Sequence, residues 1–382
     1  MFNTDKVNSS KNNLFIALFG IFFLIVSSSC TDQNKTLSIP EDYNATNFIT
    51  SATTELAVLN QLDNLVSEMK KGRSVDNNLE KVVLQNLYQA GSPSLADITT
   101  TYYDSKINGL TGFFTELEKA AGNEYNPATP NETGGVYGSY LFNQYGLEPE
   151  QQVEKGIFAA ALYNHFVRLT KTEFSENTVH QMAAIMGLNP SFPSSNNATL
   201  HSNPDRFAAV YVARRDKNDR NGFYSILKKE FIRLQAAVNQ GSDFNDERDE
   251  AIETIKQTWE KAILATVINY SYATIATLSS TSPTDVQKAS ALHAYGEAVG
   301  FLHGWKTIAQ ADKVITDAQI DALLVLLNAP SNGNPTSYLF ITDATNQLPK
   351  LLDVISEIQG IYDFTSADLE DFKKNWVSEQ SR

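Results

Sequence analysis

The sequence predicts an all-α protein of two packed up-and-down helical bundles, with long loops and at most a minor strand element. Apolar residues recur at three- and four-residue spacing along most of the chain, which is the period of an amphipathic helix. No alternating or hairpin pattern indicates a sheet, and only residues 338–341 have the composition of a short strand. Stretches rich in Gly, Pro, Asn or Ser separate the periodic segments.

The N-terminus has the features of a lipoprotein signal peptide. Lys6 and Lys11 precede the uncharged apolar stretch 14–26, which is shorter than the roughly 20 residues of a membrane-spanning helix. Serines at 27–29 lead to Cys30, and a lipoprotein signal peptidase needs such small residues in its narrow cleft. Position 27 is Ser where the usual motif carries an aliphatic residue. We therefore expect residues 1–29 to be removed and Cys30 to carry a lipid.

An ordinary secreted protein with a free thiol is the alternative, and Cys30 is the only cysteine in the chain. A disulfide or a multi-cysteine metal site within one copy is therefore excluded. The net charge of -14 argues against nucleic acid or an anionic membrane surface as a partner. The membrane contact that we expect is the N-terminal lipid, at the bacterial outer membrane, on its periplasmic side or on the cell surface.

Residues 30–48 are polar and predict a flexible linker between the lipid and a first bundle at 49–240, followed by a second bundle at 241–382. The expected helices of the first half are 53–71, 78–89, 104–121, 150–172 and 176–186. Those that follow are 223–239, 246–278, 283–310, 317–327, 347–359 and 367–376. Ser282 before Pro283, and a capping box of Thr316 with Gln319, are typical helix starts.

Three loops, 122–146, 187–204 and 329–342, are long enough to cover or shape a site, and disorder is the equal alternative. A faint repeat at an offset of 140 residues relates two helical segments, Gly156, Ala160 and Leu162 with Gly296, Gly300 and Leu302. Gene duplication and chance similarity of small-residue-rich helices explain this repeat equally well.

Gly296, Gly300 and Gly304 recur every four residues and so form one bare stripe along a predicted helix. Each glycine inside a helix costs about 1 kcal/mol relative to alanine, so three on an open surface would be a poor choice. The stripe therefore predicts that another helix backbone crosses closely at this face. Polar side chains from the two bundles would then be hidden beside the crossing.

His293 and Glu297 lie one turn apart on the same helix, next to the glycine stripe. They could ligate a metal or exchange protons. Alternatively, they form an i,i+4 contact that orients a polar pair in the core, and we favour this interpretation. His165 lies among apolar helical positions and is expected to point inward. If the two bundles pack face to face, His165, His293 and Glu297 could share one pocket.

Other patterns are weaker. Asp216, Asn218, Asp219 and Asn221 before Gly222 could form an oxygen-rich cation loop, although Arg220 stands where an EF-hand needs a ligand. The pair Glu154–Lys155 suits a solvated helix start better than a charge pair within the bundle. Trp259, Tyr270 and Tyr272 could line a ligand groove, but aromatic residues at helical spacing are more often core.

Several segments together resemble a family of Bacteroidetes lipoproteins of unknown function, whose domain is similar to imelysin, a helical periplasmic family linked to iron uptake. The segments are the leader, residues 43–71, Glu154–Lys155–Gly156 running into 159–165, and Gly296–Glu297–Ala298 with Gly300–Phe301. The resemblance covers most of residues 43–376. It implies two helical bundles with a site between them and a role near iron or haem acquisition.

Imelysin itself carries a Gly-x-His-x-x-Glu signature, once interpreted as the metal site of a peptidase. In the corresponding stretch of this chain, three residues separate His293 from Glu297 and the preceding glycine is missing. The resemblance therefore does not extend to that signature, which puts metal binding and proteolysis in doubt.

Two functions remain open from the sequence. The first is a lipid-anchored, non-enzymatic binding or accessory protein of the cell envelope, acting on a small molecule or an envelope protein in iron or haem acquisition. It suits a sequence without a G-x-S-x-G, H-E-x-x-H, Walker or dinucleotide-binding motif. The alternative is an imelysin-like metallopeptidase with His293 and Glu297 as metal ligands, for which His165 is the only third ligand we can name.

Overall fold

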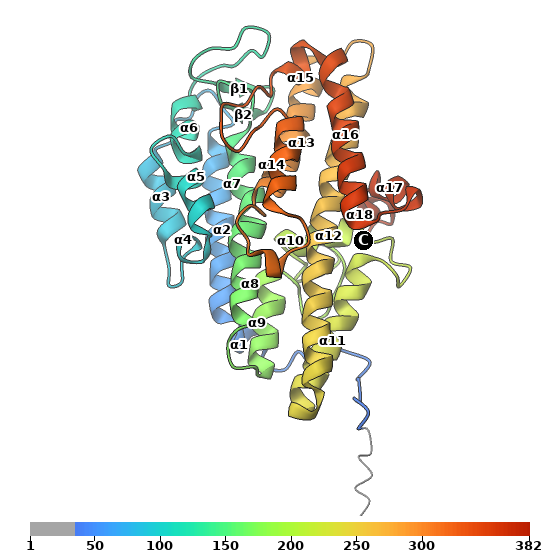
Figure 1. Ribbon diagram of the computed structural model, residues 1–382. Coiled ribbons are helices and arrows are strands. Elements are labelled where there is room, and N and C mark those ends of the chain that lie inside the picture. The colour runs from blue at the N-terminus through green and yellow to red at the C-terminus, as the bar shows by residue number, and fades with distance from the viewer. Residues whose placement is uncertain (1–34) are drawn as a thin grey trace, which may run out of the picture. The chain divides into compact units, whose positions relative to one another are not determined.

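Helices form most of the chain in a computed structural model, which describes residues 35–382 (Figure 1). The predicted signal peptide and Cys30 lie outside the described residues. The helices of the first half are α1 (Phe48–Ser51), α2 (Thr53–Lys71), α3 (Lys81–Gln89), α4 (Leu95–Ile98), α5 (Thr101–Asn108), α6 (Phe113–Ala120), α7 (Pro149–Ile157), α8 (Asn164–Leu169), α9 (Glu176–Met186), α10 (Phe207–Arg214) and α11 (Phe223–Gln240). A π-helical segment, Phe158–Tyr163, joins α7 to α8.

The second half continues in the same style and confirms the predicted all-α class. Its helices are α12 (Asn245–Leu278), α13 (Asp285–His303), α14 (Asp317–Leu326), α15 (Leu339–Thr342), α16 (Ala344–Tyr362), α17 (Ser366–Phe372) and α18 (Trp376–Glu379). Short 3-10 turns lie at Ser242–Phe244 and Gln310–Asp312. Within residues 35–382, no helix combines the length and apolar character that crossing a membrane would require.

The helices lie in two groups that meet along α7 and α13. Figure 1 shows α2, α7, α8 and α9 on one side, and α11, α12, α13 and α16 on the other. The 34-residue α12 packs against α11, α13 and α16, while α13 also packs against α7. Leu37–Arg382 forms one compact unit. The division into two bundles at residues 240 and 241 stays a prediction.

The strand element lies elsewhere than expected. Gly135–Tyr137 (β1) and Tyr140–Phe142 (β2) form an antiparallel hairpin within the predicted loop 122–146. Gly138, in the two-residue turn, has a φ of 62°, which glycine adopts without strain. The strand predicted at 338–341 is wrong, because this segment enters the helical turn α15, where the ring of Phe340 packs against Tyr295 at 4.9 Å.

The start of α13 also differs from the expectation. The helix begins at Asp285 with Thr284 as its N-cap, and Thr284 and Gln287 form a capping box. The expected start at Ser282 and Pro283 is therefore wrong by two residues, because Thr284 has the complete box and Ser282 has none. The capping box of Thr316 with Gln319 is confirmed at the start of α14.

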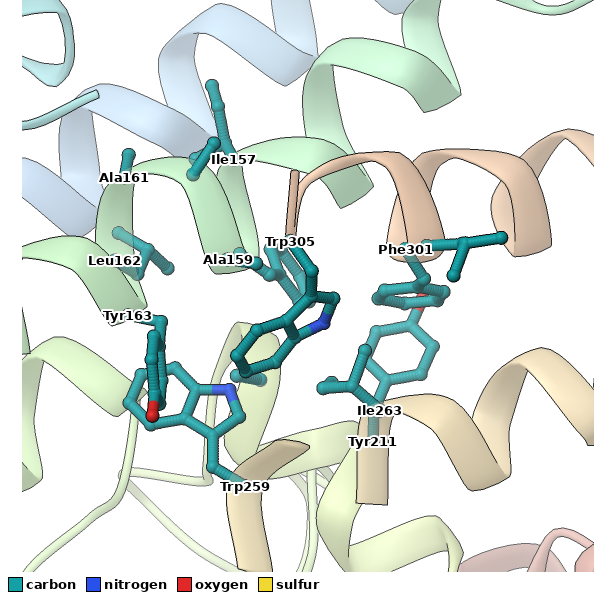
Figure 2. Close-up of a cluster of buried hydrophobic side chains, with 14 of the residues drawn as sticks. Ile157, Ala159, Ala161, Leu162, Tyr163, Tyr211, Trp259, Ile263, Phe301 and Trp305 are labelled. Atoms are coloured by element: carbon teal, nitrogen blue, oxygen red, sulfur yellow. The ribbon is translucent and has the colours of Figure 1, made fainter. Parts of the chain in front are cut away.

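Large aromatic side chains fill the core where the two groups meet. Tyr163, Trp259 and Trp305 are fully buried, and the ring of Tyr163 lies 4.6 Å from that of Trp305 and 5.3 Å from that of Trp259. Figure 2 shows these three rings beside Phe301 and Tyr211. Trp259 is thus a core residue and does not line a groove. Buried aromatic clusters of this kind contribute strongly to stability and fix the helices around them.

Candidate functional site

The candidate site is built on the crossing of α7 and α13. A Cβ atom on Gly300 would overlap the carbonyl oxygen of Gln151, and one on Gly304 would overlap that of Gly156. At Gly296 the nearest atom to a Cβ would be the Cβ of Glu148 at 3.4 Å, which is an ordinary contact. Two of the three predicted stripe glycines therefore allow a close backbone approach, while the third leaves room for a methyl group.

Seven charged or titratable side chains lie beside this crossing, and we call them the charged cluster: Arg73, Glu148, Glu150, Glu154, Lys155, His293 and Glu297. Four are carboxylates and three can carry positive charge. The side chains of Glu148 and Glu150 have no solvent exposure, and Lys155 has 4%. Such groups are tolerated in an interior only because they pair with one another.

Arg73, just after α2, joins that helix to α7. Its Nε lies 2.7 Å from Glu150 Oε2, and its Nη2 lies 2.9 Å from Glu150 Oε1 and 3.0 Å from Glu148 Oε1. Burial, and then the neighbouring Glu148, raise the pKa of Glu150 to about 7, although Arg73 acts in the opposite direction. This bidentate contact uses the fork geometry for which arginine suits carboxylates better than lysine does.

Lys155 joins α7 to α13. Its Nζ lies 2.6 Å from Glu154 Oε1 and 3.2 Å from Glu297 Oε1. Burial opposes the charge of Lys155, but Glu154 and Glu297 outweigh it and raise the pKa of the ammonium group. The expectation of a solvated helix start at Glu154 and Lys155 is therefore wrong, because α13 covers this turn of α7.

His293 contacts a different carboxylate from the one expected. Its Nδ1 lies 2.6 Å from Glu148 Oε2, whereas its Nε2 lies 3.9 Å from Glu297 Oε1. The imidazole also stacks on Tyr140 of the hairpin, with ring centroids 4.2 Å apart. Burial opposes protonation of His293, but Glu148 outweighs it and raises the pKa. His293 on α13 thus contacts both the start of α7 and the hairpin.

His165 lies away from the charged cluster. It is on α8, where its Nε2 is 3.1 Å from Glu55 Oε1 of α2. Glu148, the partner of His293, caps the start of α7, and the rest of α7 and the whole π-helical segment lie between it and His165 on α8. The structure therefore does not bring His165 into a shared pocket with His293 and Glu297.

A metal site is not formed by these residues. Within residues 35–382, no group of three or more His, Cys, Asp or Glu side chains is placed to hold a metal ion. The predicted cation loop caps a helix instead, because Asp216 Oδ1 accepts from the N–H of Asn218 at 2.5 Å and Oδ2 accepts from the N–H of Ser225 at 2.7 Å. The carboxylate of Asp216 also lies where a Cβ on Gly222 would be.

A cavity of about 650 Å³ adjoins the same crossing, and we call it the polar cavity. Its walls come from α5, α6, α7 and α13 and from residues 329–335, which belong to a loop predicted to cover or shape a site. The polar and titratable side chains in its wall include Lys106, Glu116, Lys119, Gln152 and His303. The volume is in the usual range of small-molecule sites.

Gln152 links the cavity to the crossing. Its Nε2 donates to the carbonyl oxygen of Gly296 at 2.9 Å, which fixes the amide. The residue is fully buried, and its Oε1 accepts no hydrogen bond from any residue that the structure describes. An amide oxygen left without a donor costs about 1–3 kcal/mol, and this one lies in the packed interior beside the crossing, out of reach of solvent.

The electrostatics of the polar cavity favour a positive potential. Burial raises the pKa of Glu116 to about 7, even though Asn143 donates to its carboxylate at 3.1 Å. Burial lowers the pKa of His303 to about 3, so this imidazole is neutral, and its Nε2 lies 2.9 Å from the hydroxyl of Tyr102. Lys106 and Lys119 therefore outweigh Glu116 at neutral pH.

A larger cavity, of about 700 Å³, lies between residues 42–49 and the loop after α9. Two of its charged side chains already have partners, since Arg206 pairs with Asp63 and Lys228 lies 4.0 Å from Asp42. We therefore place the candidate site at the polar cavity, whose wall contains Lys106 and Lys119.

Sequence reasoning missed most of these residues. Arg73 and Glu148 are 75 positions apart in the chain, and no local pattern joins them. The available signal was the glycine stripe, which marks where a polar face of another helix would be covered. Comparison of the chain with protein-family models, with curated proteins and with solved structures finds no match.

Proposed function

We propose that this chain is a lipid-anchored, non-enzymatic binding or accessory protein of the bacterial cell envelope, and that its ligand occupies the polar cavity. The observation that supports a ligand there is the cavity of about 650 Å³ beside the crossing of α7 and α13, whose volume is in the range of small-molecule sites. The two lysines in the wall add attraction for a polar or anionic molecule.

The anchor and the location are proposed from the leader. Residues 1–29 and Cys30 have the pattern of an exported lipoprotein, which favours the outer membrane, on the periplasmic side or at the cell surface. Iron or haem acquisition is the process that we propose, and its support is the resemblance to the imelysin-like lipoproteins. No observation favours the metallopeptidase alternative, because His165 lies too far from His293 and Glu297 to complete a set of ligands.

The anchor is tested with the full chain and its Cys30→Ala variant, expressed in a bacterium that processes lipoproteins and fed with labelled palmitate. We expect the label and detergent-phase partitioning in the parent chain and neither in the variant. Equal labelling of both, or of neither, contradicts a lipid on Cys30.

The ligand site is tested with Leu37–Arg382, the unit that contains the core described above. Haem is titrated by absorbance and bound ferric iron is measured after dialysis. Thr111 is exposed at the cavity wall, so Thr111→Trp should obstruct the cavity without altering the core. Thr281→Trp, at an exposed position that does not line the cavity, is the matched control.

We expect haem or iron to bind the parent and Thr281→Trp alike, and Thr111→Trp at least tenfold more weakly. Binding that Thr111→Trp leaves unchanged contradicts the cavity as the site. No spectral shift at micromolar haem and no retained iron contradict the link to iron or haem.

A further inference from the structure

The larger cavity, of about 700 Å³, differs from the polar cavity in the character of its wall, and we call it the apolar cavity. Helices α1 and α2 and the loop after α9 each contribute apolar side chains to it, namely Phe48, Ile49, Leu56, Leu59, Leu188 and Phe192. Its volume is in the range of small-molecule sites. Hydrocarbon that enters such a cavity leaves water and contacts apolar side chains, which is favourable in proportion to the area covered.

Part of this apolar wall is open to solvent. Ile49 is 67% exposed and Leu56 is half-buried, so a ligand can reach both side chains. Ala45, which lines the same cavity, is also exposed. A hydrocarbon chain in the cavity would therefore cover apolar surface that the folded protein leaves in contact with water.

The charged side chains of the wall are Asp42, Arg206 and Lys228. Two cations and one carboxylate make this wall positive, in a chain whose net charge is -14. Arg206 forms an ion pair with Asp63, and its guanidinium lies 5.3 Å from the centre of the Phe207 ring. Arg206 is thus engaged with the protein itself, and its charge adds to the local potential.

Lys228, on α11, is the cation that can hold a ligand. Its Nζ lies 4.0 Å from Asp42 Oδ1, which is too long for a hydrogen bond, and the two side chains are 41% and 84% exposed. An ion pair as exposed as this one contributes little to stability. Within residues 35–382, no acceptor takes a hydrogen bond from this ammonium group. Its N–H groups can therefore donate to an anionic group at the apolar cavity.

We propose that the apolar cavity binds a fatty acid, with the hydrocarbon chain against α1, α2 and the loop after α9 and the carboxylate held by Lys228. A cationic amphiphile would be repelled by Lys228 and Arg206, and a neutral one would leave Lys228 without an anionic partner. The inference concerns a second site, so it depends neither on the polar cavity nor on the lipid anchor.

The test measures binding to Leu37–Arg382 by isothermal titration at pH 8, where a fatty acid is ionised, below the concentrations at which the probes form micelles. Dodecanoate is compared with dodecyltrimethylammonium, which has a chain of the same length and the opposite charge. We expect dodecanoate to bind at least tenfold more tightly. The net charge of -14 favours the cation wherever binding is unspecific, so this preference reports the local site. Decanoate should bind about tenfold more weakly than dodecanoate, which is the effect of leaving two methylene groups unburied.

Two pairs of variants locate the site. Ala45→Trp should obstruct the cavity from its exposed wall, and Ala128→Trp, at an exposed position that does not line it, is the control. Lys228→Gln removes the proposed carboxylate partner, and Lys229→Gln removes the next charge on the same helix, which does not line the cavity.

We expect dodecanoate to bind about tenfold more weakly to Ala45→Trp and to Lys228→Gln, and to bind both controls like the parent. No dodecanoate binding to the parent, equal affinity for the two dodecyl probes, or unchanged binding by Ala45→Trp or Lys228→Gln overturns the inference.

Discussion

Replacing Gly300 by alanine tests directly how closely α7 and α13 approach. The new Cβ would overlap the carbonyl oxygen of Gln151 and would lie 3.0 Å from the Cβ of Lys155. Both contacts are on α7, and a helix backbone cannot turn away as a long side chain can. The two helices must therefore separate locally, or α13 must bend.

The magnitude follows from two opposing effects. Overpacking of a well-filled interior costs about 1–3 kcal/mol, and the upper end applies because the contacted atom is backbone. Alanine in a helix gains about 1 kcal/mol over glycine. We therefore expect Gly300→Ala to lower the free energy of unfolding by about 2 kcal/mol. Gly296→Ala meets only an ordinary contact at 3.4 Å, so it should raise the free energy by about 0.5–1 kcal/mol.

Urea unfolding of Leu37–Arg382 and of both variants, followed by far-ultraviolet circular dichroism, measures the two changes. Because both substitutions are Gly→Ala on the same helix, helix propensity cancels between them and the difference reports the crossing. A shift of both variants in the same direction and by the same amount would refute the close approach at Gly300.

Three further predictions concern charge. Lys155→Met should lower the free energy of unfolding in urea by about 3–5 kcal/mol, because it leaves buried carboxylates without their cation. The control Lys171→Met, in which the replaced side chain is 63% exposed, should lower it by under about 1 kcal/mol, and equal losses would contradict this. His293→Gln should remove a stabilisation that is full below about pH 6.5 and is lost as pH rises through the raised pKa of His293; parallel pH profiles of parent and variant would contradict it. Glu116→Gln should match the parent below pH 4.5 and exceed it by about 1–3 kcal/mol above pH 7, because folding raises the pKa of this acid to about 7; a constant difference across pH would exclude that cause.

The helices could be predicted because helical periodicity is a local property. The capping box of Thr316 is formed by residues three apart, so it is visible in the sequence and is present in the fold. The hairpin was missed because each strand has three residues, too short for an alternating pattern, inside a segment rich in glycine. Residues 338–341 have the composition of a strand, but composition alone does not supply a partner strand.

The site was only partly predictable, since a helix shows its own bare face but not what covers it. The glycine stripe located the crossing on α13. It could not identify α7 as the partner, nor show that Gln152 would be held by the backbone of Gly296. The acidic residues at the start of α7 have the pattern of a solvated helix start. They are buried because Arg73 and α13 cover them, which the local sequence does not show.

The crossing and the polar cavity should therefore respond together. Gly300 does not line the cavity, yet Gln152 and His303 do, and both belong to the two helices that Gly300 holds close. The hydrogen bond from Gln152 to Gly296 spans the crossing, so any separation of α13 from α7 lengthens it and frees the amide to turn. Gly300→Ala should thus weaken the binding of haem or iron in the polar cavity, while Gly296→Ala should leave it intact.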